Sequence, residues 1–193
     1  MRNNVNVQVY TSCNCDCKFC HFADRNNIKI NPQFVLDYLN ENGHVIDVVL
    51  TGGEPTFAID ECVEIIKGLK ETNRVVTLQT NGWWGENEKI KTALKENPPS
   101  IVHLSVDNEK QKTIPIETVL KAHRFLVENG IKTFVVNHTL RDDNDEHNYY
   151  KSLFDDLKYG RIVYDNGTDL NDCGVALLAV NKVGRLNIKG WVM

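Results

Sequence analysis

Four of the six cysteines in the chain lie between Ser12 and Cys20, in the stretch SCNCDCKFC. Thiols at this density can bind zinc, form disulfides, act as a redox pair or hold an iron–sulfur cluster. The two remaining cysteines, Cys62 and Cys173, are single and far apart. A structural zinc site normally uses two separated pairs of ligands, and this chain offers no second pair, so zinc is weakly supported.

The expected cellular location helps to choose among the other three possibilities, which are disulfides, a redox pair and an iron–sulfur cluster. The first ten residues, MRNNVNVQVY, contain no uninterrupted apolar segment and no cleavage site, and no apolar run reaches membrane-spanning length. We therefore expect a cytoplasmic protein with reduced thiols, which disfavours a disulfide framework. A redox pair would use only Cys17 and Cys20 and leave Cys13 unexplained. The net charge of -4, without long runs of one sign, argues against non-specific nucleic-acid or membrane binding.

The elements that must position these cysteines form a regular alternation. At 193 residues the chain is long enough for one domain with a sizeable core. The predicted strands are Val5–Tyr10, His44–Thr51, Val75–Thr80, Ile101–Asp107, Lys132–Thr139 and Gly160–Asp165. The predicted helices are Asn31–Asn42, Asp60–Thr72, Asn87–Glu96, Pro115–Asn129 and Glu146–Tyr159.

Parallel strands need crossover connections, so this alternation indicates an α/β fold with a parallel sheet. Several strands alternate polar and apolar residues, as in Asn6, Gln8 and Tyr10 against their valine neighbours. A sheet covered by helices on both faces would be apolar throughout. We therefore predict a partial (β/α)6 TIM-like barrel over residues 1–165 with a polar lumen. Residues 166–193 break the alternation and predict a hairpin of Val175–Val180 and Arg185–Ile188.

The polar residues of interest follow consecutive strands. The cysteine stretch comes after the first strand, TGGEPT after the second, QTNG at the end of the third, SVDN at the fourth and VNHT at the fifth. In barrel enzymes the active site lies at the carboxyl ends of the strands. We therefore expect these five segments to meet at one site.

The cysteine spacing and one further motif resemble a known family. The pattern Cys13-x3-Cys17-x2-Cys20, with the aromatic Phe19 before the last cysteine, resembles the signature of the radical S-adenosylmethionine (SAM) superfamily. The sequence GGEP, Gly52 to Pro55, resembles the motif that binds the SAM methionine amino group in that family. The resemblance extends from about Val5 to Thr139. It implies a 4Fe-4S cluster held by three thiolates, with one iron open to SAM.

The resemblance also assigns roles to individual residues. It makes Cys13, Cys17 and Cys20 the cluster ligands and Glu54 the acceptor of the SAM ammonium, a role that suits a carboxylate. Gly52 and Gly53 would let the backbone approach the ligand closely. Further SAM-binding positions implied by the resemblance are Phe19, Pro55, Thr80, Asn81, Ser105, Asp107 and Asn137. Cys15 falls within the x3 gap and is interpreted as a bystander. Cys62 is interpreted as a helix residue whose thiol is buried in the hydrophobic core.

The implied activity is reductive cleavage of SAM to a 5′-deoxyadenosyl radical, which abstracts hydrogen from a substrate. An electron donor such as flavodoxin or ferredoxin would be the partner. The tail resembles the start of a SPASM or twitch domain, which favours a peptide or protein substrate, although such domains need more cysteines than Cys173 alone. The alternatives are a glycyl-radical-enzyme activase, a small-molecule enzyme of the deazapurine type, or a non-catalytic metal-binding regulatory module.

Overall fold

The structure is a computed structural model that describes residues 3–18, 20, 26–140, 144–154, 159–164, 176–180 and 186–189. Its strands are β1 (Asn4–Tyr10), β2 (Asp47–Gly52), β3 (Val75–Thr80), β4 (Ile101–Val106), β5 (Thr133–Leu140), β6 (Tyr159–Tyr164), β7 (Ala176–Val180) and β8 (Leu186–Lys189). Its helices are α1 (Pro32–Glu41), the 3-10 helix η1 (Pro55–Ala58), α2 (Ile59–Leu69), α3 (Glu88–Glu96), α4 (Asn108–Gln111), α5 (Ile116–Glu128) and α6 (Asn144–Leu153).

All eight strands belong to one sheet, in the order β6-β5-β4-β3-β2-β1-β7-β8. Strands β1 to β6 follow one another in chain order and every pair among them is parallel. The predicted α/β fold with a partial barrel of six strands is therefore confirmed. The predicted hairpin is present as the antiparallel pair β7–β8. It extends the main sheet, because β7 pairs in parallel with β1, with Val5 opposite Ala176.

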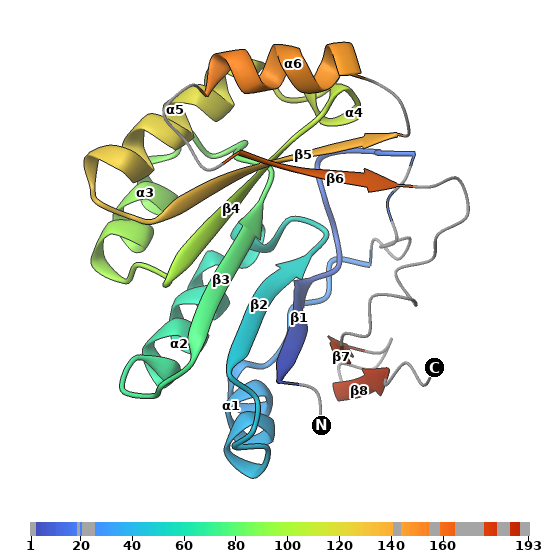
Figure 1. Ribbon diagram of the computed structural model, residues 1–193. Helices are drawn as coiled ribbons and strands as arrows, with labels where there is room; N and C mark the ends of the chain where they lie inside the picture. Colours follow the sequence, from blue (N-terminus) through green and yellow to red (C-terminus); the bar gives the residue numbers. More distant parts are fainter. Residues whose placement is uncertain are drawn as a thin grey trace.

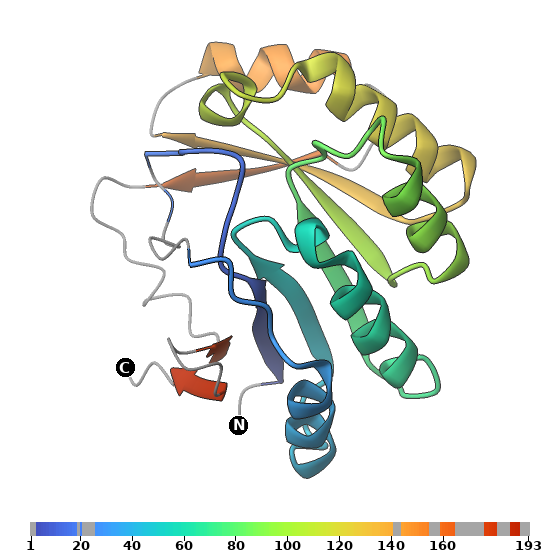
Figure 2. The ribbon, with the colours of Figure 1, turned by 180° about the vertical axis from the view of Figure 1, so that it is seen from behind.

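The helices cover one face of the parallel strands, as Figures 1 and 2 show from opposite sides. Val5, Val7 and Val9 are fully buried in the core between the sheet and the helices. The other face is polar, as predicted. There, Gln8 lies beside Thr51, and Gln79 lies beside His103 on the next strand pair.

Local sequence signals explain where most helices begin. Asn31 caps α1 by accepting the N–H of Gln33 at 2.9 Å, and Pro32 occupies the first helical position. Asn87 caps α3 through the N–H of Ile90 at 3.2 Å. Helix α2 buries Cys62, and burial raises the pKa of its thiol. Cys62 is therefore a core thiol, as predicted.

The structure differs from the predicted elements at several places. The helix expected to run to Tyr159 ends at Leu153, because the backbone of Tyr159 already pairs with Val135 in β5. The short helices η1 and α4 were not predicted, since each is only four residues long. The predicted domain boundary at residue 165 lies outside the described residues. Within the described part of the chain, every helix falls short of the length and apolarity that crossing a bilayer requires.

Candidate active site at the carboxyl ends of the strands

The loop after β2 packs against the segment that leads into the cysteine stretch. The N–H of Gly53 donates to Tyr10 O, and the N–H of Glu54 donates to Ser12 O, both at 2.8 Å. A Cβ atom on Gly53 would lie 2.1 Å from Ser12 O, and Gly52 has a φ of +137°. The two glycines therefore permit the close approach of two backbone segments. Sequence analysis predicted that these two glycines would let the backbone approach a bound ligand closely.

Glu54 is buried beneath this loop, with 1% of its surface exposed. Its Oε1 accepts hydrogen bonds from the hydroxyls of Thr56 (2.6 Å) and Thr80 (2.7 Å) and from the N–H of Thr56 (3.2 Å). Its Oε2 accepts the N–H of Asn81 at 2.8 Å. Burial raises the pKa of the carboxyl, although these hydrogen bonds oppose that shift. The structure thus shows a carboxylate that accepts four hydrogen bonds from the protein.

The cysteine stretch begins at the end of β1 and brings Cys13, Cys15 and Cys17 together. Cys15 is buried, and its N–H donates to Cys13 Sγ at 3.3 Å. Hydrogen bonds to Cys13 and Cys17, together with burial, raise the pKa of the Cys15 thiol. The hydrogen bond from Cys15, aided by the charge of Lys110, lowers the pKa of Cys17. The two thiols therefore shift in opposite directions, the pKa of Cys15 upward and the pKa of Cys17 downward.

Cys20, the third predicted ligand, is exposed. Its N–H donates to Cys17 O at 3.0 Å, which places it one turn beyond Cys17. Phe19 lies outside the described residues. Among the residues that are described, no three His, Cys, Asp or Glu side chains form a group that could hold a metal ion. The three cysteines thus share one loop without converging on a point.

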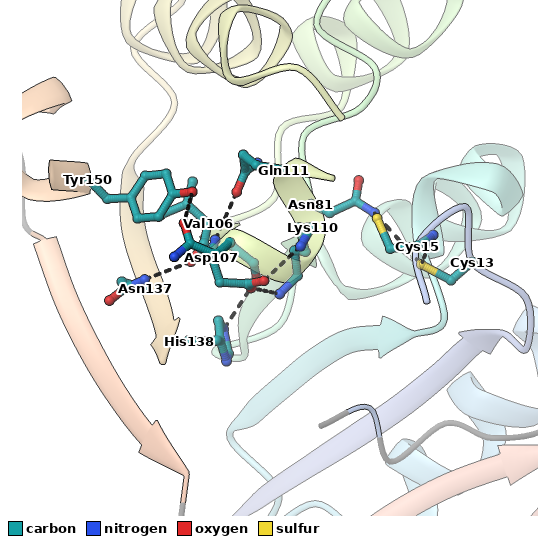
Figure 3. Close-up of polar contacts among 12 residues, drawn as sticks. Cys13, Cys15, Asn81, Val106, Asp107, Lys110, Gln111, Asn137, His138 and Tyr150 are labelled. Carbon is teal, nitrogen blue, oxygen red and sulfur yellow. Dashed lines mark hydrogen bonds and ion pairs between the residues drawn. The ribbon is translucent and has the colours of Figure 1, made fainter. Parts of the chain in front are cut away.

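Thr80 and Asn81 end β3 and face the loop after β2. The Thr80 hydroxyl accepts the N–H of Gly82 (3.2 Å) and the indole N–H of Trp84 (3.0 Å) while it donates to Glu54. The side-chain amide of Asn81 points to the cysteine stretch (Figure 3) and donates to Asn14 Oδ1 at 2.9 Å. Both residues are nearly fully buried. Their polar groups therefore connect three strand ends to one another.

The end of β4 carries a buried ion pair. Asp107 caps α4 by accepting the N–H of Lys110 at 2.8 Å, and its carboxylate also pairs with the Lys110 ammonium. Ser105 lies on the inner face, 3.4 Å from the ring Nε2 of His138. Burial lowers the pKa of His138 to about 3, so this imidazole is neutral at physiological pH. Figure 3 shows Asp107, Lys110 and His138 grouped together.

Asn137 and His138 lie on opposite faces of β5. Asn137 pairs with Val106 in register, and its amide donates to Val106 O (3.1 Å) and to Glu146 of α6 (3.4 Å). Its side chain is therefore directed to the helix side of the sheet, whereas His138 lies beside Ser105 on the inner face. Sequence analysis named Asn137 for the SAM contact. That contact stays a prediction.

Two residues at this site, Lys110 and Asn14, were not named by sequence analysis, whereas Trp83 was interpreted as a packing or lid residue. Lys110 follows Asp107 by three residues, and this spacing was an available signal for a cap and an ion pair. Asn14 lies inside the cysteine stretch and carried no such signal. Trp83 donates its indole N–H to the Thr56 hydroxyl at 2.8 Å and stacks on Phe57, with ring centroids 4.5 Å apart. These contacts identify Trp83 as a packing residue of the loop after β2.

The chain matches one protein family over most of its length. The family is the radical SAM superfamily, and the match covers residues 7–151. The chain belongs to the radical SAM superfamily. Members of this superfamily are enzymes that use a 4Fe-4S cluster and SAM. The cysteine-rich stretch after β1 suits such a cluster in its donor set, since Cys13, Cys17 and Cys20 supply three thiol sulfurs on one loop.

Solved structures of radical SAM enzymes have the same fold. The structure "Native anSMEcpe with bound AdoMet and Cp18Cys peptide" has a TM-score of 0.63 at 22% identity and covers 83% of this chain and 50% of its own. Streptococcus suis SuiB bound to S-adenosylmethionine has a TM-score of 0.71 at 16% identity, covering 89% and 45%. TYW1 with a lysine-pyruvate adduct has a TM-score of 0.56 at 15% identity, covering 84% and 65%.

This chain spans about half the length of the first two of these structures. At these identities the likeness establishes the fold alone. No curated protein sequence matches the chain.

Proposed function

We propose that this protein is a radical SAM enzyme whose cluster is held by Cys13, Cys17 and Cys20. When bound, the reduced cluster supplies the electron that cleaves SAM to methionine and a 5′-deoxyadenosyl radical, which abstracts hydrogen from the substrate. The observation that supports this most directly is the meeting of the cysteine stretch with the ends of β2 and β3. That arrangement rests on hydrogen bonds from Asn81 to Asn14 and from Glu54 to Ser12.

The residues around the cysteine stretch have proposed roles in holding the loops of the site and in orienting SAM. Glu54 fixes the ends of β2 and β3 through its four donors, so its proposed role is to position the SAM-binding loop. A direct contact between Glu54 and the SAM ammonium stays a prediction. Ser105, with the neutral His138 beside it, offers a hydroxyl on the inner face for the SAM ribose or carboxylate. Lys110 provides a cation on the same side of the site.

We also propose a peptide or protein as the substrate class. Support comes from the fold shared with anSMEcpe, whose structure contains a bound peptide. The hairpin β7–β8, which was compared with the start of a SPASM or twitch domain, is consistent with the same branch. We retain the division into a core of residues 1–165 and an extension of residues 166–193, the electron donor of flavodoxin or ferredoxin type, and the cytoplasmic location as further parts of the proposal.

The alternative is a small-molecule substrate. Support for it comes from the fold shared with TYW1, whose structure contains a lysine-pyruvate adduct. The two alternatives predict different products from the same first step. Deuterated peptide extracts and deuterated small-molecule extracts, each incubated with unlabelled SAM, would separate them. Mass spectrometry would detect deuterium in 5′-deoxyadenosine only when the true substrate is present.

The basic activity is tested by anaerobic reconstitution with iron and sulfide. The protein should gain the visible absorbance of an iron–sulfur cluster and release 5′-deoxyadenosine from SAM in the presence of dithionite. The variant Cys17→Ala should do neither. A colourless protein that carries stoichiometric zinc would instead support the non-catalytic metal-binding module.

A further inference from the structure

The side chain of Asn81 links the turn after β3 to the cysteine stretch. Its Nδ2 donates to Asn14 Oδ1 at 2.9 Å and lies 3.7 Å from Cys15 Sγ and 3.8 Å from Cys13 Sγ (Figure 3). Only 4% of its surface is exposed. The amide is thus a buried donor directed at the stretch that carries the predicted cluster ligands.

The orientation of this amide is fixed by the protein. Its Oδ1 accepts the N–H of Trp83 at 3.1 Å, an interaction that only the oxygen end of the amide can make. The nitrogen end therefore faces the cysteines. The backbone of Asn81 is held in turn, because its N–H donates to Glu54 Oε2 at 2.8 Å. The donor is consequently held in place from both the backbone and the side chain.

Donors near a ligand sulfur affect its charge. A hydrogen bond to the charged form of a group favours that form, and hydrogen bonds to cluster sulfurs are among the factors that set a reduction potential. Cys13 Sγ receives the N–H of Cys15 at 3.3 Å in addition to the Asn81 amide. Two N–H groups thus face one sulfur. The reduced cluster carries more negative charge than the oxidised one, so these donors stabilise the reduced state.

We propose that Asn81 is a positioning residue that fixes Cys13 through its side-chain amide and raises the reduction potential of the cluster. This inference rests on the proposed function, since it requires Cys13 to be a cluster ligand. It gives Asn81 a role different from the SAM contact that sequence analysis assigned to it. The proposal also gives a role to Glu54. Its carboxylate accepts the backbone N–H of Asn81 and so holds in place the side-chain amide that faces Cys13.

The test compares Asn81→Asp with the wild-type protein. Aspartate has nearly the same shape and keeps an acceptor for the Trp83 N–H, but it loses the donor and places a negative charge beside the cysteines. We expect the midpoint potential, measured by a redox titration followed by electron paramagnetic resonance, to move to a more negative value. We also expect fewer iron atoms per chain after reconstitution.

A matched control separates this role from loss of stability. Asn87→Ala removes a cap at the start of α3 and costs about 1 kcal/mol of stability, but Asn87 lies outside the site. Its cluster should have the wild-type potential and iron content. If Asn81→Asp does not fold, Asn81→Ser gives the same comparison, because a serine hydroxyl can still accept the Trp83 N–H but reaches less far toward Cys13.

The outcomes are distinguishable. A wild-type protein that binds no cluster contradicts the proposed function. A wild-type cluster whose potential and iron content are unchanged in Asn81→Asp and in Asn81→Ser contradicts the role of Asn81 alone. A shift of equal size in Asn87→Ala would also contradict it, because the effect would then follow from stability.

Discussion

The carboxylate of Glu54 accepts the backbone N–H of Asn81 at 2.8 Å, and this contact joins the loop after β2 to the turn after β3. The same carboxylate accepts the hydroxyl of Thr80 at 2.7 Å. Burial of this acidic side chain has two opposing effects. It organises two strand ends, but burial disfavours its charged form and raises its pKa.

This raised pKa predicts how stability depends on pH. An acid whose pKa is higher in the folded state contributes most stability below its unfolded pKa, near 4.5, and that contribution is lost as the pH rises through the folded pKa. Glutamine at position 54 does not titrate, so Glu54→Gln should remove this part of the decline in unfolding free energy. Urea unfolding at several pH values between 4 and 8 measures the unfolding free energy of the wild-type protein and the variant. The exposed residue Glu128 supplies the control variant Glu128→Gln, which should keep the wild-type pH dependence.

The close approach of two backbones at Gly53 predicts a strong effect of one added methyl group. Gly53→Ala would place a Cβ atom 2.1 Å from Ser12 O, and backbone atoms cannot move aside easily. We expect a loss of about 2 kcal/mol or more in unfolding free energy. Gly43→Ala is the matched control, because nothing lies within 4 Å of its Cβ atom, and it should change stability by less than about 0.5 kcal/mol. Equal melting temperatures for the two variants would contradict this contact.

Cys15 and Cys17 should respond differently to substitution by alanine. Cys15→Ala keeps the backbone N–H that donates to Cys13 Sγ, so the iron content after reconstitution should stay at the wild-type level. Loss of its buried thiol should cost about 1 kcal/mol of stability. Cys17→Ala removes a predicted ligand and should abolish the cluster. Iron and sulfide analysis measures both variants, and an equal loss of iron from the two would make Cys15 a ligand.

The ion pair at the start of α4 predicts a third contrast. Lys110→Met leaves the carboxylate of Asp107 buried without its cationic partner, and a broken buried pair typically costs about 3–5 kcal/mol. Lys112→Met breaks an exposed pair with Glu109 three residues away, and such pairs contribute less than about 1 kcal/mol. Thermal unfolding of the two variants checks the difference. The prediction fails if Lys110→Met unfolds at the temperature of Lys112→Met.

Sequence analysis predicted the parts of the structure that depend on local patterns. The alternation of valines with Asn6 and Gln8 gave the polar inner face, and the apolar spacing in α2 identified Cys62 as a core residue. These features are visible because a strand and a helix each repeat with a fixed period. The parallel pairing of the six strands followed from the need for crossover connections.

The contacts of the site could not be predicted in the same way. Whether Asn137 or His138 lies on the inner face depends on the register of β5 against β4, and one residue of shift reverses it. The donors to Glu54 come from residues on two separate strand ends, and no local pattern pairs them. Motif resemblance singled out Glu54, but only the fold shows which groups its carboxylate contacts.

The pairing of β7 with β1 has a consequence for how the protein is made. Val5 and its neighbour Ala176 are separated by more than a hundred residues of the chain. During synthesis, β1 can pair with β2 before β7 has been made, so the other edge of β1 has no strand partner until β7 follows. Contacts between such distant residues slow folding. The strand that leads into the cysteine stretch therefore gains its second neighbour only after β7 has been synthesised, and we expect insertion of the cluster to follow that pairing.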